Sequence, residues 1–234
     1  MTNERTSRGV IIPAAGRGTR FGGATPKQFL ELLGVPLLVR CIRIALQTQN
    51  VNAVVVAIHP DDEVVVSEIF VRFDLADARL HVVRGSTERQ HSVRAALAHP
   101  SLTHVGIILV HDAVRPLSSP ELWETVASSS LEKQAVVPVI PIADTLKSVD
   151  HHGRVRGTVD RSTLFRVQTP QGFASSLFRR AYDDAEASGR VGTDCASLVE
   201  QLGSPVHTVP GEETNFKVTT PYDLDVAEFI LQKL

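Results

Sequence analysis

Short apolar runs alternate with segments of helical spacing along most of this chain, and that alternation constrains the fold more than any other feature. The apolar runs, each a predicted strand, are 9–14, 52–58, 80–83, 105–111 and 135–140. The intervening segments, each a predicted helix, are 37–46, 61–73, 88–98 and 120–128. Repeated strand-helix-strand units favour a mostly parallel sheet covered by helices, so the sequence predicts an α/β fold.

The alternation breaks at Pro141. The stretch 141–168 has β character, many charges and a turn signal at His152-Gly153. An isolated hairpin is only marginally stable in water, so we expect this β-arm to pack on a second copy of the chain. Helices at 175–187 and 194–202 and a strand at 205–209 follow, and Thr220 and Pro221 are typical of the start of a last helix. We interpret 1–234 as a single domain, with 141–168 as its arm.

Composition excludes several classes of protein. The chain has 234 residues, 43% of them hydrophobic, which is enough to bury a substantial core. Its net charge of -2 gives no reason to expect a nucleic acid or a membrane as partner. The only cysteines, Cys41 and Cys195, have no metal or redox spacing, and the first eight residues are polar. We therefore expect a cytoplasmic protein in a reducing compartment.

A glycine-rich, cationic loop follows the first predicted strand and is typical of a phosphate site. Its small residues let backbone amides close on an anion, and they are Ala14, Ala15, Gly16 and Gly18. Its cations are Arg17, Arg20 and Lys27. The loop is neither a P-loop nor a dinucleotide fingerprint, because position 21 is Phe and the next glycine is Gly22. It therefore indicates a phosphate-binding protein other than an ordinary GTPase or dehydrogenase.

Further polar groups fall where this topology places ligands, at the carboxyl ends of strands. Asp112 and Arg115 end one apolar strand, and a carboxylate there can hold a Mg²⁺ ion that bridges phosphates. Gly85 and Ser92 lie in a turn that leads into a helix and can contact a base or a sugar. Other polar groups within apolar sequence lie at 158–161, 169–171, 193–194 and 215–219.

Together these segments resemble the cytidylyltransferases that make CDP-methylerythritol from CTP and 2-C-methyl-D-erythritol 4-phosphate in the non-mevalonate isoprenoid pathway. The likeness covers almost the whole chain. It rests on Pro-Ala-Ala-Gly-x-Gly-x-Arg with Pro-Lys-Gln, Gly-x-x-x-Arg-x-x-Ser-Val, His-Asp-Ala-x-Arg-Pro, Thr-Val-Asp-Arg, Thr-Pro-Gln and Lys-Val-Thr. The resemblance implies a Rossmann-like three-layer nucleotidyltransferase fold, a Mg²⁺ cofactor, and a homodimer joined through its β-arms.

The resemblance also implies a role for each matching residue. The cations that would stabilise the transferred phosphoryl group are Arg20, Lys27 and Lys217. The residues that would surround CTP are Pro13, Ala14, Ala15, Gly16 and Gly18, with Gly85 and Ser92 at cytosine and ribose. Asp112 would lie at the metal and the sugar. The residues on the acceptor side would be Arg115, Thr169, Thr193 and Arg161, the last reaching the methylerythritol phosphate from the partner subunit's arm.

Two other functions stay open at this point. One is a cytidylyltransferase for a pentitol phosphate such as ribitol 5-phosphate, because Ser86, Val114 and Cys195 depart from the family pattern close to the substrates. The other is a non-catalytic nucleotide-binding regulator, although a pure binder has no evident need for cations crowded on the transferred phosphoryl group. We interpret Arg17 as a solvated cation, because the family keeps no fixed residue there.

Overall fold

The computed structural model describes residues 4–17 and 25–233. The strands of its central sheet are β1 (Arg8–Ala14), β4 (Val51–Ile58), β5 (Leu80–Arg84), β6 (Ile107–Val110), β7 (Ala135–Pro141), β10 (Phe165–Val167), β11 (Gln171–Ala174) and β12 (His207–Pro210). Their order is β10-β7-β11-β6-β1-β4-β5, and β12 pairs with β7. β1 runs parallel to β4 and β6, and β4 runs parallel to β5, whereas β11 is antiparallel to both its neighbours. The predicted mostly parallel sheet is confirmed.

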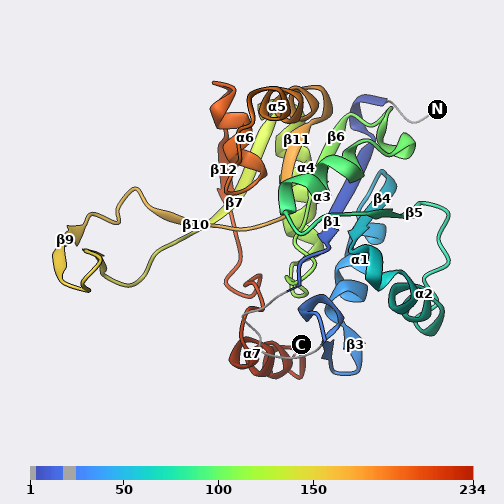
Figure 1. Ribbon diagram of the computed structural model, residues 1–234, viewed down its shortest axis with the longest axis horizontal. Coiled ribbons are helices and arrows are strands. Elements are labelled where there is room, and N and C mark those ends of the chain that lie inside the picture. Colours follow the sequence, from blue (N-terminus) through green and yellow to red (C-terminus); the bar gives the residue numbers. More distant parts are fainter. Residues whose placement is uncertain (1–3, 18–24, 234) are drawn as a thin grey trace.

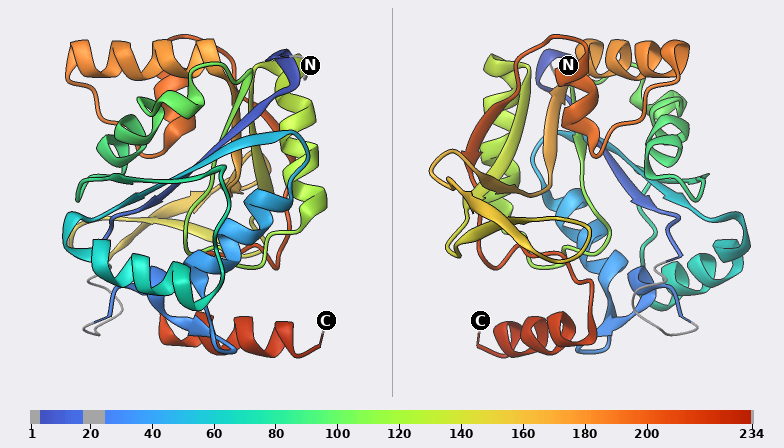
Figure 2. Two further views of the ribbon diagram at one scale, coloured as in Figure 1. Left: turned by 90° about the vertical axis from the view of Figure 1, so that its right-hand side faces the viewer. Right: turned by 60° about the vertical axis from the view of Figure 1, so that its left-hand side comes forward.

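Side chains that alternate along the strands build a core on each face of the sheet. In β1, Val10 and Ile12 pack on one face and Ile11 on the other, and none of the three is exposed. The helices on the Val10 face are α1 (Leu37–Gln47), α2 (Glu63–Arg72) and α4 (Pro120–Lys133). Those on the Ile11 face are α3 (Arg89–Leu97), α5 (Ser175–Ser188) and α6 (Cys195–Gln201). The result is a three-layer fold (Figures 1 and 2).

Helix boundaries follow local chemistry. The predicted helix over 61–73 begins as a 3-10 turn, η4 (Pro60–Asp62), and continues as α2. The last helix, α7 (Pro221–Leu231), begins as predicted, because the Thr220 hydroxyl accepts the amide of Asp223 and Pro221 takes the first position. α7 packs beside β2 (Glu31–Leu32), which pairs with β3 (Val35–Pro36) in a small hairpin that the sequence pattern did not predict. Among the helices of the described residues, none is long and apolar enough to cross a membrane.

A hairpin of β8 (Leu146–Val149) and β9 (Val155–Val159) projects from the sheet, and β10 leads back to β7 (Figure 1). The Asp150 carboxylate accepts the amides of His152 and Arg154 and so closes its turn, where Gly153 has a φ of +77°. Val149, Val155 and Val159 are 57%, 61% and 37% exposed. That this hairpin binds a second copy stays a prediction.

Candidate active site

A cavity of about 350 Å³ opens where β1 and β6 end and α3 begins. Its lining residues are Pro13, Ala14, Ala15, Gly16, Arg17, Lys27, Gln28, Ser86, Thr87, Arg89, Ser92, Asp112, Ala113, Val114 and Lys217. The charged ones are four cations against a single carboxylate, that of Asp112. An excess of positive charge in a recess at the ends of parallel strands suits a polyanionic ligand.

The base of the glycine-rich loop is closed by Gln28. Its buried side-chain amide donates to the carbonyl of Ala14, at the end of β1, over 2.7 Å. The short helix η3 (Lys27–Phe29) is thereby held against the strand and places Lys27 at the cavity. Sequence reasoning gave Gln28 no role, although it belongs to the quoted Pro-Lys-Gln. The predicted residues Gly18 and Arg20 lie outside the described residues.

Arg17 is exposed, as the sequence suggested, but it is also paired with carboxylates. Its guanidinium donates to the carboxylates of Asp61 and Asp62 at 2.6 and 3.0 Å, and lies 2.7 Å from Nδ1 of His59. The Asp62 side chain is only 8% exposed, so Arg17 gives a nearly buried carboxylate a charged partner. These contacts join the start of the loop to η4.

Asp112 is the electrostatic centre of the cavity. Its Oδ1 accepts from Arg89 Nε at 3.2 Å and lies 3.1 Å from Nη2, and its Oδ2 accepts from Lys217 Nζ at 3.1 Å. Arg115 adds a contact of 3.5 Å to Oδ2. Burial acts to raise the pKa of Asp112, but Arg89, Lys217 and Arg115 outweigh it and hold that pKa well below its ordinary value. The carboxylate is therefore ionised and available to a cation or a hydroxyl group.

A chain of hydrogen bonds beneath Asp112 fixes its backbone. The Asp112 amide donates to the Thr169 hydroxyl at 3.0 Å, which lies 3.1 Å from His111 Nδ1, and His111 Nε2 lies 3.0 Å from the Arg115 carbonyl. Every partner is satisfied when Thr169 donates to Nδ1 and the imidazole proton sits on Nε2. Burial lowers the pKa of His111 to about 4, which keeps the ring neutral in that tautomer.

The turn before α3 comes within van der Waals reach of the loop. A Cβ on Gly85 would lie 2.9 Å from both Ala15 Cβ and Ser92 Oγ, so only glycine fits there. The Ser92 hydroxyl, itself buried, accepts the amide of Ser86 at 2.9 Å and donates to the Ser86 carbonyl at 2.8 Å. Ser92 therefore shapes the wall on which we predicted cytosine and ribose contacts.

The predicted acceptor residues are only partly brought together. Thr169 and Arg115 contact Asp112 as described above. Thr193 is exposed and comes just before Asp194, the N-cap of α6, whose carboxylate accepts from Gln171 Nε2 at 2.6 Å. Arg161 lies in the exposed segment after β9 and is not among the described residues that line the cavity. Arg161 was predicted from the Thr-Val-Asp-Arg motif alone. Within this chain it does not reach the cavity around Asp112.

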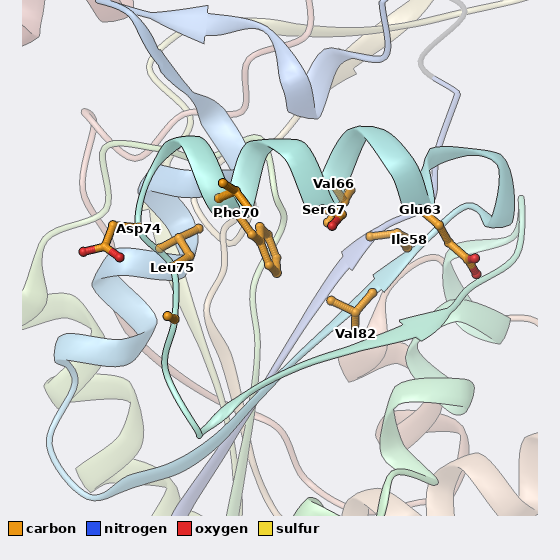
Figure 3. Close-up of a pocket in the computed structure, with 10 residues that line it drawn as sticks. Ile58, Glu63, Val66, Ser67, Phe70, Asp74, Leu75 and Val82 are labelled. Atoms are coloured by element: carbon orange, nitrogen blue, oxygen red, sulfur yellow. The ribbon is translucent and has the colours of Figure 1, made fainter.

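A larger cavity, of about 550 Å³, lies between α2 and the edge strand β5 (Figure 3). Phe70, Leu75 and Val82 form much of its wall, and Glu63 and Asp74 are its charged residues. An apolar wall with acidic groups repels phosphates, so size alone does not identify the site. Among the described residues no group of three or more His, Cys, Asp or Glu side chains is arranged to hold a metal ion without help from a ligand.

Comparisons with known proteins agree with this geometry. The model of the 2-C-methyl-D-erythritol 4-phosphate cytidylyltransferase family matches residues 9–233. A protein of that name from Saccharopolyspora erythraea is 45% identical over 226 residues, which cover 94% of this chain and 97% of the relative. One from Acidobacterium capsulatum is 40% identical over 232 residues, covering 96% and 97%.

Solved structures give the same result. The structure of 4-diphosphocytidyl-2C-methyl-D-erythritol synthase from Anaerococcus prevotii superposes with a TM-score of 0.83 at 29% identity, covering 98% of this chain and 100% of the other. That of 2-C-methyl-D-erythritol 4-phosphate cytidylyltransferase from Thermus thermophilus superposes with a TM-score of 0.79 at 35% identity, covering 97% and 99%. The likeness therefore extends through the whole fold.

Proposed function

Because this chain belongs to the 2-C-methyl-D-erythritol 4-phosphate cytidylyltransferase family, it transfers a cytidylyl group from CTP to that sugar phosphate, and we propose that it does so in the cavity around Asp112. The products are CDP-methylerythritol and pyrophosphate, in isoprenoid precursor biosynthesis. The observation that supports this location is the set of cations around one ionised carboxylate at the carboxyl ends of β1 and β6.

The reaction needs charge neutralisation more than proton transfer. A phosphate oxygen of the acceptor attacks the α-phosphorus of CTP in line, and the bond to the bridging oxygen of pyrophosphate breaks. The nucleophile is already ionised, so no general base is required, and positioning and electrostatics supply the rate. In our proposal Arg20, Lys27 and Lys217 stabilise the transferred phosphoryl group. Lys217, which contacts Asp112 in this structure, turns to the α-phosphate when the nucleotide binds.

In our proposal, the glycine-rich loop and the segment at the start of α3 hold the nucleotide. We assign Pro13, Ala14, Ala15, Gly16 and Gly18 to the triphosphate and the base, and Gly85 and Ser92 to cytosine and ribose. The close approach of Gly85 to Ala15 supports a narrow slot between the two backbone segments.

Asp112 fits a Mg²⁺ ion as its one protein carboxylate. Magnesium in phosphate-transfer sites takes one or two carboxylates, with phosphate oxygens and waters completing an octahedron. Asp112 is the one carboxylate among the described lining residues, and it is ionised, which matches that donor set. When bound, Mg²⁺ supplies charge neutralisation at the triphosphate. Asp112 in turn orients the ribose edge of the nucleotide.

The acceptor side requires a second subunit in our proposal. Arg161 lies on the projecting arm and is exposed, and the valines of β8 and β9 are exposed beside it. A homodimer in which each arm covers its partner buries those valines and brings Arg161 to the neighbour's acceptor phosphate, opposite Arg115, Thr169 and Thr193. The rest of 1–234 works as one domain around the cavity, with 141–168 as the exchanged arm.

Both cysteines support a reducing, cytoplasmic compartment. Cys41 and Cys195 are buried free thiols, and burial raises the pKa of Cys41 to about 12. We propose that the enzyme works there.

Acceptor profiling tests this function. Purified protein receives CTP and Mg²⁺ with either 2-C-methyl-D-erythritol 4-phosphate or ribitol 5-phosphate, and pyrophosphate release is measured. We expect a large kcat/KM preference for the methylerythritol phosphate. A preference for ribitol 5-phosphate would instead assign the enzyme to pentitol phosphates, and nucleotide binding without turnover on either acceptor would indicate a regulator.

A further inference from the structure

Arg89, the first residue of α3, connects two parts of the site that belong to different substrates. Its Nε and Nη2 face Oδ1 of Asp112, and its Nη1 donates to the sulfur of Cys195 at 3.1 Å. Asp112 follows β6, and Cys195 is the first residue of α6. One planar guanidinium therefore ties together the ends of three elements that are far apart in the sequence.

The far end of this connection is firmly held. The Cys195 side chain has no exposed surface, and its sulfur lies 3.4 Å from the hydroxyl of Tyr182, on α5. Burial raises the pKa of Tyr182, so this hydroxyl keeps its proton. An arginine with both edges of its fork engaged has few conformations left, unlike a lysine on a flexible stem.

The two oxygens of Asp112 are thereby given different tasks. Arg89 occupies Oδ1, whereas Oδ2 faces Lys217, the residue that we assign to the α-phosphate, with Arg115 at the longer distance of 3.5 Å. When Lys217 turns to the nucleotide, Arg89 remains on Oδ1 because Cys195 anchors it. Oδ2 then stays aimed at the substrate.

Arg89 also joins the nucleotide wall to the acceptor segment. Gly85 lies in the turn before Arg89, Ser92 follows Arg89 on α3, and Cys195 comes two residues after Thr193. We propose that Arg89 is a positioning residue for cytidylyl transfer, which keeps Asp112 and the Thr193 segment in register with the nucleotide-binding turn. This inference rests on the function proposed above.

The predicted kinetic signature is a fall in kcat with little change in KM for CTP. Misplacing reacting groups by about 1 Å can lower a rate by about a hundredfold, because alignment and not affinity is lost. For Arg89→Met, which keeps the length but removes the fork, we expect kcat to fall by about 10- to 100-fold and KM for CTP to change less than about threefold. Arg89→Lys keeps a charge beside Asp112, but one ammonium group cannot also hold Cys195, so it should recover only part of the loss.

A double-mutant cycle separates positioning from a general loss of structure. Cys195→Ala should lower kcat by about three- to tenfold, and Arg89→Met combined with Cys195→Ala should be no slower than Arg89→Met alone, because both act through one connection. Arg94→Met is the matched control. Arg94 lies on the same helix and pairs with Asp183 and Glu186 instead, so its kcat should stay at the wild-type level.

The experiment combines steady-state pyrophosphate release, calorimetric CTP binding without acceptor, and thermal melting of each variant. Wild-type kcat in Arg89→Met, a KM for CTP that rises with kcat unchanged, or losses that multiply in the double mutant would overturn the inference. If Arg89→Met does not fold, Arg89→Lys and Cys195→Ala decide by the same kcat and KM criterion. A wild-type enzyme without turnover would overturn the proposed function, whereas an active wild type with a fully active Arg89→Met would overturn only this inference.

Discussion

The cavity around Asp112 contains buried polar groups, whereas the projecting arm carries exposed apolar groups. Around the cavity, Asp112, His111 and Thr169 are buried, and each finds partners within its own chain. In the arm, β8 and β9 form a two-stranded sheet of their own, and the valines along them face solvent. Buried polar groups need fixed partners, whereas exposed apolar groups gain free energy when another surface covers them.

This difference teaches which parts of the site the single chain can organise. Among the described residues, the nucleotide side is held together by contacts between β1, β6 and the turn before α3, all within one chain. In our proposal the acceptor side depends on Arg161, which is exposed on the arm and is not among the described residues that line the cavity. A single chain thus holds half of the chemistry that we propose.

The largest expected effect is on the nucleotide side. Lys27→Ala should lower kcat by at least about a hundredfold, by analogy with the loss of one oxyanion donor, while the fold persists. Steady-state pyrophosphate release measures the effect, and CTP binding confirms an intact cavity. Lys133→Ala, at the exposed end of α4, is the control and should keep wild-type kcat. Unchanged kcat in Lys27→Ala would remove this lysine from the mechanism.

A second test asks whether the imidazole of His111 is buried and neutral beneath the cavity. The pKa of His111 is lowered from 6.5 to about 4 in the folded chain, chiefly by burial. The unfolded chain therefore binds this proton first, and stability is lost as pH falls from about 6.5 to about 4, by on the order of 3 kcal/mol. Urea unfolding across that range should show a shallower decline for His111→Gln than for wild type. Equal slopes would contradict a buried neutral imidazole.

The arm is tested by complementation between two inactive variants. Arg161→Ala and Lys27→Ala are mixed under conditions that exchange subunits, and activity is compared with each variant alone. Random exchange makes half of the dimers mixed, with one intact site in two, so activity should return to roughly a quarter of wild type. Proven subunit exchange without recovery would show that Arg161 serves its own chain's cavity or none.

Much of the fold follows from local pattern. The strand 9–14 and the Thr220 cap depend on alternation and on a single hydroxyl, and both were predictable. The carboxyl ends of parallel strands meet at one edge, which is why Asp112 could be expected at a ligand site. Lys27 and Lys217, which line the same cavity, were expected beside it from the motifs that carry the family resemblance. The short strand β11 was missed, because four residues with a glycine among them carry no clear period.

Arg89 shows what sequence could not supply. Its motif was recognised, yet its partners Asp112 and Cys195 lie 23 and 106 positions away and are brought to it only by tertiary structure. In addition, no spacing of residues in a sequence predicts a contact between an arginine and a thiol. Gln28 was missed for the same reason, since its role depends on the end of a strand that precedes it by a whole loop.

The smallest expected effect is on stability, at Arg17, which lines the cavity and is partly exposed to solvent. Arg17 is 37% exposed, but its partner Asp62 is nearly buried. Exposed ion pairs contribute little, whereas a buried carboxylate that loses its partner is destabilising, so Arg17→Ala should lower the free energy of unfolding by about 1 kcal/mol. The matched control is Arg84→Ala, whose pair with Glu63 is exposed on both sides and should change stability less.

Urea unfolding of Arg17→Ala, Asp62→Asn and the double variant measures the coupling energy between the two side chains. A coupling energy near zero would show that Arg17 contributes no more than a solvent-exposed cation. A clear coupling energy would show that the fixed contacts around the cavity extend to the start of the glycine-rich loop.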